Sequence, residues 1–363
     1  MQGTAGSIPP LWRARSVGIG ISLLLALALT ACSTPMTGLR TGSSAGPLVV
    51  TPAMIAAREN LSRMAALQDR LYRVAAPLLI NNAELCPKQA RGLLGFTAKN
   101  KYSYPGEFAD AAQAALGYDE RLQVSGVLAG SGAQHAGLRK GDALITAGGK
   151  PLPTGPNAET EAAAIFGPLV ANRAALTLTV ARDSASRNLN VPVTRACGFR
   201  VDLGSSDNVN SYTDDQRILI TRGMINFAQT DDGIAIVLAK GMAHNILGHA
   251  AAQRSSATLG SVIDNLDGVR PDLSMLIGSA GIKPMPQELD AAADSLALYL
   301  LARAGYNIDN AARFWQRLAT QYPATVLNGY TANHPGTAYR IAAINKTVAE
   351  IKGKQAAKKA LLP

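Results

Sequence analysis

Cysteine and histidine are scarce in this chain, whose 363 residues include only three cysteines and four histidines. Aromatic residues make up 5% of the chain and do not alternate with the basic ones. Lysine and arginine number 35 against 25 acidic residues, but a basic excess without interleaved aromatic residues argues against nucleic-acid binding. The formal net charge of +10 allows contact with anionic lipid or an envelope polymer, and a solvated basic surface is the alternative.

Acidic residues are absent from residues 1–31, which have the features of an export signal. Two arginines precede an apolar run that ends at Leu29 and is too short to be a convincing membrane span. The run is followed by Thr-Ala-Cys and resembles the bacterial lipobox. This resemblance implies that Cys32 becomes the lipidated first residue of the mature protein. By analogy, Ser33 favours the outer membrane, with the protein facing the periplasm. An ordinary secretory signal is the alternative.

Two cysteines, Cys86 and Cys197, remain once Cys32 is acylated. An even pair of cysteines in an oxidising compartment predicts a disulfide. Two free buried thiols are the alternative. Between the anchor and the folded part, residues 43–47 are rich in glycine, serine and proline and form a short tether. Apolar residues then recur at threes and fours from Pro52 to Asn82, which predicts one long amphipathic helix.

The segment from residue 116 to 196 has a different pattern, in which short apolar runs alternate with glycines. Gly-Ser-Gly-Ala at 130–133 and Ala-Gly-Leu-Arg-Lys-Gly-Asp at 136–142 precede two predicted strands, 176–181 and 188–193. The segment resembles a PDZ domain of the bacterial protease type. Such domains bind an extended peptide as an added strand and hold its C-terminal carboxylate on backbone N–H groups.

Leu116, Gly117 and Tyr118 are the candidates for the loop that holds this carboxylate. A PDZ domain that only packs on its neighbour is the alternative. Cys86 and Cys197 flank the PDZ segment, so their bond would clamp the points where the chain enters and leaves it.

The stretch 231–250 is apolar at helical spacing and predicts a buried helix over 233–254. It resembles the active-site helix of metallopeptidase family forty-eight, the zinc endopeptidases related to HtpX, whose motif is His-Glu-x-x-His. Lys240 stands where the resemblance implies the first zinc ligand, and Gly241 where it implies the general base. His244 matches the second ligand. A lysine ammonium repels a divalent cation and glycine accepts no proton, so this part of the zinc chemistry is missing.

The family resemblance continues towards the C-terminus. The segments 208–212 and 218–224 resemble a strand pair that forms an antiparallel sheet beside the active-site helix. The segment 292–306 resembles the Glu-Ala-Asp helix, which implies that Ala292 takes the place of the third zinc ligand. Asp294 is then a supporting residue behind the metal, and His334 resembles the family's His-Pro near the last helix.

A rearranged metal site is the competing interpretation. His244, His249 and His334 are available as ligands. Two residues five apart on one helix point about 140° away from each other, however, so His244 and His249 are not expected to share an ion. Asp290 and Glu288 are displaced along their helix from the third-ligand position. We expect no cofactor, and zinc only under this competing interpretation.

These patterns predict an α+β protein with a zincin-like, mainly helical peptidase domain, a small antiparallel sheet and an inserted, β-rich PDZ domain. We expect a pseudopeptidase that binds polypeptides or a protein partner through its PDZ groove, in periplasmic or outer-membrane protein quality control; an active zinc endopeptidase with rearranged ligands is the alternative. We also predict that Lys240 contacts Asp294 in place of a metal. The predicted segments are a leader (1–31), a tether (32–51), a helical part of the peptidase domain (52–115), the PDZ domain (116–196), the peptidase domain (197–352) and a basic tail (353–363).

Overall fold

The computed structural model describes residues 51–104, 106–249, 287–322 and 338–363. These residues belong to one compact unit, Val50–Pro363. The predicted leader with Cys32, the end of the predicted helix beyond residue 249, and His334 lie outside the described residues. Within the described ranges, no helix is both long and apolar enough to cross a membrane.

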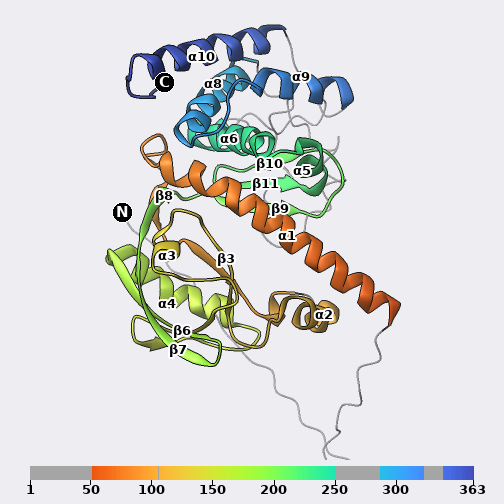
Figure 1. Ribbon diagram of the computed structural model, residues 1–363, viewed down its shortest axis with the longest axis vertical. Coiled ribbons are helices and arrows are strands. Elements are labelled where there is room, and N and C mark those ends of the chain that lie inside the picture. Colours follow the sequence, from red (N-terminus) through yellow and green to blue (C-terminus); the bar gives the residue numbers. More distant parts are fainter. Residues whose placement is uncertain (1–50, 105, 250–286, 323–337) are drawn as a thin grey trace, which may run out of the picture. The chain divides into compact units, whose positions relative to one another are not determined.

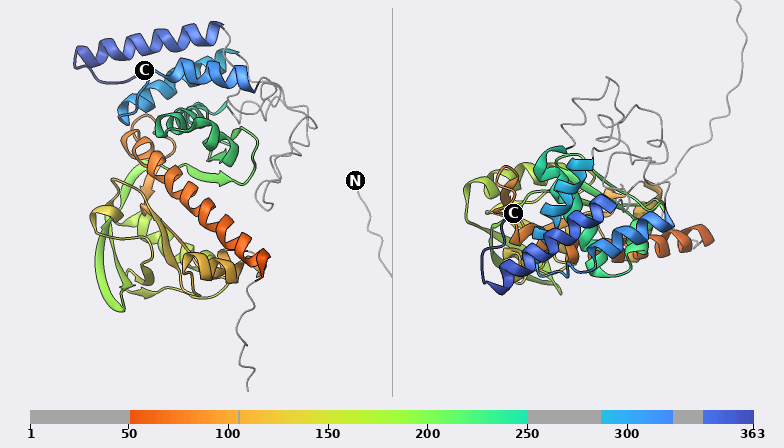
Figure 2. Two further views of the ribbon diagram at one scale, coloured as in Figure 1. Left: turned by 45° about the vertical axis from the view of Figure 1, so that its right-hand side comes forward. Right: turned by 90° about the horizontal axis from the view of Figure 1, so that it is seen from above.

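The first helix, α1 (Pro52–Asn81), matches the predicted amphipathic helix. Thr51 caps its start, because its side chain accepts a hydrogen bond from Met54 N at 3.2 Å. Only the second half of the helix is deeply buried, through Leu71 and the residues from Val74 to Leu79. In Figures 1 and 2, α1 runs between the β-rich part and the helical part of the protein.

The β-rich part contains a PDZ-like sheet with the strand order β2-β3-β4-β6-β7, in which neighbours are antiparallel and β5 pairs with β4. The predicted strands 176–181 and 188–193 correspond to β6 and β7, which a turn with positive φ at Asp183 and Ser184 connects. The elements of this part are β1 (Ala90–Leu93), β2 (Phe96–Lys99), η1 (Lys101–Ser103), α2 (Gly106–Leu116), β3 (Gln123–Val127), α3 (Gly132–His135), β4 (Ala143–Ala147), β5 (Lys150–Pro151), α4 (Ala158–Asn172), β6 (Ala175–Arg182), β7 (Ala185–Pro192) and β8 (Thr194–Cys197).

This sheet begins earlier in the chain than the predicted boundary at residue 116. Strand β2 pairs with β3, with Phe96 opposite Val127, and Phe96 belongs to the buried core of the sheet. Residues 90–93 and 96–99, predicted to lie in a helical part of the peptidase domain, therefore form strands. A four-residue strand is too short to show a clear alternation of apolar and polar residues, and its partner lies far away in sequence.

A disulfide joins Cys86 to Cys197, as predicted. Just inside it, β1 and β8 form a two-stranded antiparallel pair in which Ala90 lies opposite Cys197. The bond and the strand pair together fasten the two ends of the PDZ-like segment to each other.

The rest of the chain forms a small sheet and the surrounding helices. Strands β10 and β11 are antiparallel, as predicted, but β9 pairs with β11 in parallel, so the sheet is mixed rather than antiparallel. The elements are β9 (Arg200–Gly204), β10 (Ser211–Thr213), β11 (Arg217–Thr221), α5 (Arg222–Ala228), α6 (Asp231–Leu247), α8 (Gln287–Arg303), α9 (Ala311–Gln321) and α10 (Ala338–Ala356).

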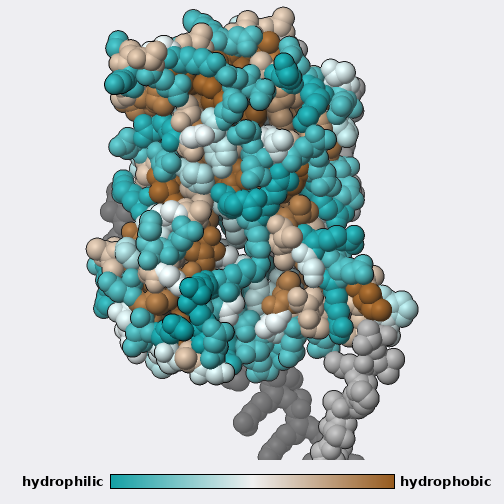
Figure 3. Space-filling view, viewed as in Figure 1, coloured by the Kyte–Doolittle hydropathy of each residue, from teal (hydrophilic) through white to brown (hydrophobic). Residues whose placement is uncertain are grey.

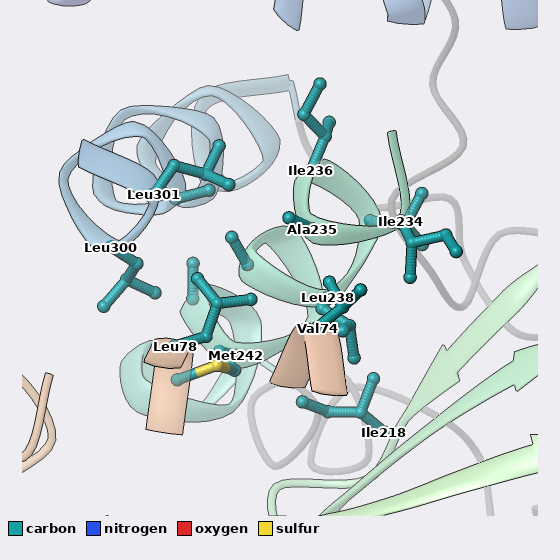
Figure 4. Close-up of a cluster of buried hydrophobic side chains, with 14 of the residues drawn as sticks. Val74, Leu78, Ile218, Ile234, Ala235, Ile236, Leu238, Met242, Leu300 and Leu301 are labelled. Carbon is teal, nitrogen blue, oxygen red and sulfur yellow. The ribbon is translucent and has the colours of Figure 1, made fainter. Parts of the chain in front are cut away.

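Helix α6 is buried from Gly233 to Asn245 and forms the centre of this core. Apolar side chains from α1, β11 and α8 surround it, as Figure 4 shows for Val74, Ile218 and Leu300. The prediction that the helix reaches residue 254 is wrong. It ends at Leu247, because Gly248 adopts the left-handed conformation, with φ of 68°.

The surface is mostly hydrophilic on the face shown in Figure 3, where hydrophobic residues form separate small patches. Buried apolar side chains form two cores, one in the PDZ-like sheet and one around α6.

Candidate functional site

Lys240 on α6 lies in the interior, opposite two aspartates of α8. Its Nζ is 2.7 Å from Asp294 Oδ1 and 2.8 Å from Asp290 Oδ1, and all three side chains are at most 3% exposed. Nζ also donates to the backbone oxygen of Asp290 at 2.7 Å. The predicted contact between Lys240 and Asp294 is thus present.

Arg340 of α10 completes this buried cluster. Its Nε lies 2.5 Å from Asp294 Oδ2, its Nη2 donates to Asp294 Oδ1 at 2.8 Å, and its Nη1 lies 3.6 Å from Asp290 Oδ2. The guanidinium carbon is 4.1 Å from the centre of the Trp315 ring, a cation–π contact. Among the described residues, two cations therefore face two carboxylates, and their formal charges balance without a metal ion.

The titration behaviour of the cluster follows from its burial and its charges. Burial, together with the charge of Arg340, lowers the pKa of Lys240, and the two aspartates oppose this shift. Burial by itself would raise the pKa of Asp290, but the charges of Lys240 and Arg340 hold it well below its usual range. Among the described residues, the cavity beside Lys240 measures about 10 Å³, which is about the space of one water molecule.

His244, one turn after Lys240, has its two ring nitrogens in different surroundings. Its Nε2 lies 3.5 Å from Asp290 Oδ1, and its Nδ1 lies 2.9 Å from Nδ1 of His249. Burial lowers the pKa of His244, and that of His249 falls to about 4 for the same reason. The prediction that the two imidazoles point apart is wrong, because the chain leaves the helix at Gly248 and brings His249 back to His244.

The expected position of the third metal ligand also needs correction. Ala292 is exposed, whereas Asp290 is 2% exposed and faces His244. Asp290 and Asp294 are four residues apart and share one face of α8, while Ala292 lies between them on another face. Asp290 therefore occupies the place next to His244 that the resemblance had given to Ala292.

Gly241 marks a close approach between α6 and the small sheet. A Cβ added there would lie 2.9 Å from Ile218 Cγ2 and 3.1 Å from Thr213 Cγ2. These distances are too short for ordinary contacts, so a longer side chain needs the neighbours to move. The position of the family's catalytic glutamate is thus closed by packing as well as changed in sequence.

The cluster does not fit a catalytic zinc site. Tetrahedral zinc in hydrolases takes three protein ligands, and here the first of them is replaced by an ammonium that already bridges two carboxylates. His249 and Asp290 approach opposite nitrogens of His244, so the three cannot converge on one ion. Among the described residues, no group of three or more histidine, cysteine or acidic side chains is arranged to hold a metal.

A second candidate site is a cavity of about 1260 Å³ along β2, the edge strand of the PDZ-like sheet. We call it the β2 groove. Leu94 and Gly95 line it at the turn that leads into β2, and Gly95 has a φ of 78°. Backbone N–H groups at the start of an edge strand are suited to hold a peptide carboxylate.

Leu116, Gly117 and Tyr118, the predicted carboxylate loop, do not line the β2 groove. Tyr118 is buried instead and stacks on Tyr104, with ring centres 6.1 Å apart. The loop before β2 was missed because Gly-Leu-Leu-Gly-Phe at 92–96 lay outside the predicted PDZ segment. Its glycine-flanked apolar run was the available signal.

Comparison with known proteins agrees with the arrangement around α6. Residues 172–348 match the model of a family described as "Peptidase family M48". The mitochondrial metalloendopeptidase OMA1 of Saccharomyces cerevisiae is 25% identical over 139 residues, which are 36% of this chain and 40% of the relative. OMA1 of Schizosaccharomyces pombe is 24% identical over 145 residues, 38% of this chain and 43% of the relative. The match thus spans less than half of these relatives' length.

Solved structures similar to this chain include the HtrA3 PDZ domain bound to a phage-derived ligand, with 17% identity and a TM-score of 0.23. That match covers 30% of this chain and 92% of the other. An HtrA-type protease with a decapeptide has 23% identity and a TM-score of 0.21, and 29% of each chain is covered. The match to the peptidase family M48 model covers residues 172–348, which include β9–β11, α5, α6 and α8.

Proposed function

We propose that this protein is a peptidase-like binding protein that holds extended polypeptides and does not hydrolyse them with zinc. The observation that carries this proposal is the position of Lys240, whose ammonium lies within 2.8 Å of both Asp290 and Asp294. In a zinc peptidase, a dipositive ion would supply positive charge to such a site. Here a lysine supplies it from inside the fold.

Zinc binding would carry a large free-energy cost in this arrangement. The cluster is already balanced, so an added dication would have to displace Lys240 from its two carboxylates or deprotonate it. Gly241 then leaves no general base to activate water, and the packing of Ile218 against it leaves little space for one. The ion pairs of Lys240 thus take the place of the first zinc ligand, and the packing of Ile218 against Gly241 takes the place of the general base.

Polypeptide binding is assigned to the β2 groove. Among the described residues, no strand pairs with the outer edge of β2, and an unpaired edge offers a row of backbone donors and acceptors. A peptide added there as a strand would place its C-terminal carboxylate near Leu94 and Gly95.

The proposed location is the outer membrane, with the protein anchored through Cys32 and facing the periplasm. The lipobox-like sequence supports this location, and so does the disulfide between Cys86 and Cys197, since such bonds persist in oxidising compartments. There the protein would take part in envelope protein quality control, because extended segments are exposed in unfolded clients.

Metal analysis of the purified full-length protein tests the proposal. We expect less than stoichiometric zinc and no chelator-sensitive cleavage of casein. One equivalent of zinc that disappears in His244→Ala, but not in the exposed-histidine control His135→Ala, would restore the alternative of an active zinc endopeptidase.

A further inference from the structure

The β2 groove has a wall on each side of the sheet edge. Phe96 of β2 points toward α4, where its ring meets Phe166 with centres 5.9 Å apart. The next residue, Thr97, points to the opposite face. There the ring of Tyr72 from α1 and Thr97 Oγ1 both lie next to Gly126 of β3, 3.0 and 3.2 Å from the point where a Cβ would be. The edge of β2 is therefore flanked by α4 on one face and by α1 on the other.

The α4 wall lines the groove with the small residues Ala162, Ala163 and Gly167 and with the larger Glu159, Phe166 and Val170. Glu159, Ala163, Gly167 and Val170 recur at intervals of four, four and three residues, so they share one face of the helix. A Cβ added at Gly167 meets no atom within 4 Å. This side of the groove has open space for large side chains of a bound strand.

The α1 wall is extended by β9. Leu203 of β9 lines the groove, and its backbone N–H donates to Gln68 Oε1 of α1 at 3.3 Å. Because this backbone N–H is already hydrogen-bonded, Leu203 contributes its side chain, and not its backbone donor, to the β2 groove. Gln68 Nε2 is buried and has no acceptor among the described residues, and a carbonyl of a bound strand would satisfy it.

We infer that the β2 groove binds one extended strand and contacts both sets of its alternating side chains, an inference that rests on the proposed function. Successive side chains of a strand point to opposite faces, so one set meets α4 and the other meets α1 and β9. A sheet edge flanked by a helix on one face alone would leave the second set in solvent. Here Tyr72 and Leu203 face it instead.

The ligand class follows from these two walls. Phe166 and Val170 on one side, and Tyr72 and Leu203 on the other, favour apolar side chains at consecutive positions of the ligand. Consecutive apolar residues are typical of segments that are buried on both faces in folded proteins. The groove therefore selects unfolded or unassembled polypeptide segments over the alternating segments of surface strands.

Selection from a random nine-residue peptide library, displayed on phage with free C-termini, tests this inference on the full-length protein. We expect enrichment of apolar residues at consecutive positions. With a selected peptide, Gly167→Leu should weaken binding by about tenfold by filling the α4 side, without lowering the melting temperature. Leu203→Ser should weaken it mainly through alternate ligand positions, and Gln68→Ala should weaken it for every ligand by removing the donor to a ligand carbonyl. The exposed-glutamine control Gln113→Ala should not change it.

The outcomes separate this inference from the proposed function. One outcome is enrichment of apolar residues only at every second ligand position, with binding unchanged in Leu203→Ser and Gln68→Ala. This result would refute contact with the α1 and β9 side and would leave strand binding at β2 intact. No enriched peptide from the library would contradict both.

Discussion

Lys240 on α6 and Asp294 on α8 form an ion pair with 2.7 Å between Nζ and Oδ1, and neither side chain is more than 3% exposed. Buried charges are costly unless each has a partner, so such a pair persists only when the surrounding cluster is complete. Asp290 and Arg340 complete it with one further charge of each sign. The cluster joins three helices, α6, α8 and α10.

Removing the Lys240 charge should destabilise the fold. Lys240→Ala leaves two buried carboxylates with Arg340 as their nearby cation, and loss of one partner from a buried pair costs about 3–5 kcal/mol. Urea unfolding followed by circular dichroism measures this change. The control is Lys352→Ala, which removes an exposed pair with Asp309 and should change stability little. Equal effects of the two variants would contradict the role given to the cluster.

Acid should destabilise the protein in two steps. The pKa of His249 falls to about 4 from 6.5, so the fold favours the neutral imidazole. The resulting stability is present above pH 6.5 and is lost as the pH falls towards 4. The pKa of Asp290 is held well below its usual value, so its contribution is present above about pH 4 and is lost as the pH falls further.

Melting temperatures between pH 7 and pH 3 measure both steps. His249→Gln should reduce the loss of stability between pH 6.5 and 4, to which the lowered pKa of His244 also contributes. His135→Gln, at an exposed position, should leave this loss unchanged. A stability that rises on acidification from pH 6.5 to 4 would refute this assignment.

Restoring a metal site should depend on Asp290 and not on Ala292. Lys240→His combined with Asp290→Glu places three zinc ligands around one point together with His244, and we expect stoichiometric zinc by metal analysis. Lys240→His combined with Ala292→Glu puts the acid on an exposed face and should bind no zinc tightly. Adding Gly241→Glu should cost about 1–3 kcal/mol, because the side chain overpacks against Ile218.

Loss of the disulfide should weaken the fold. Cys86→Ser with Cys197→Ser should lower the free energy of unfolding by about 2–5 kcal/mol, since the bond closes a long loop. Denaturant titration of oxidised protein and of the double variant measures the difference. Labelling of either cysteine by an alkylating reagent in denatured, unreduced protein would show that the bond is absent.

Membrane attachment should depend on Cys32. A Cys32→Ala variant should be found in the soluble fraction of cell envelopes, while the unchanged protein sediments with outer membranes. Identical fractionation of the two proteins would eliminate lipidation at this residue as the anchor.

Local pattern was enough to predict the long helix at 52–81, the strands β6 and β7 and the pairing of Cys86 with Cys197. Periodicity and residue type act over a few neighbouring residues, and the disulfide followed from having only two cysteines left. The contact between Lys240 and Asp294 was also predicted, because a site without a metal would leave a buried acid that needs a cation.

Tertiary structure decided the rest. Which residues of α8 face His244 depends on how that helix is rotated against α6, and this rotation brings in Asp290 and turns Ala292 outwards. Gly248 ends α6 by adopting a left-handed conformation, which a sequence permits but does not require, and so brings His249 onto His244. Strand β2 exists because β3 pairs with it, and its four residues carry too little local pattern to reveal the edge where the β2 groove lies.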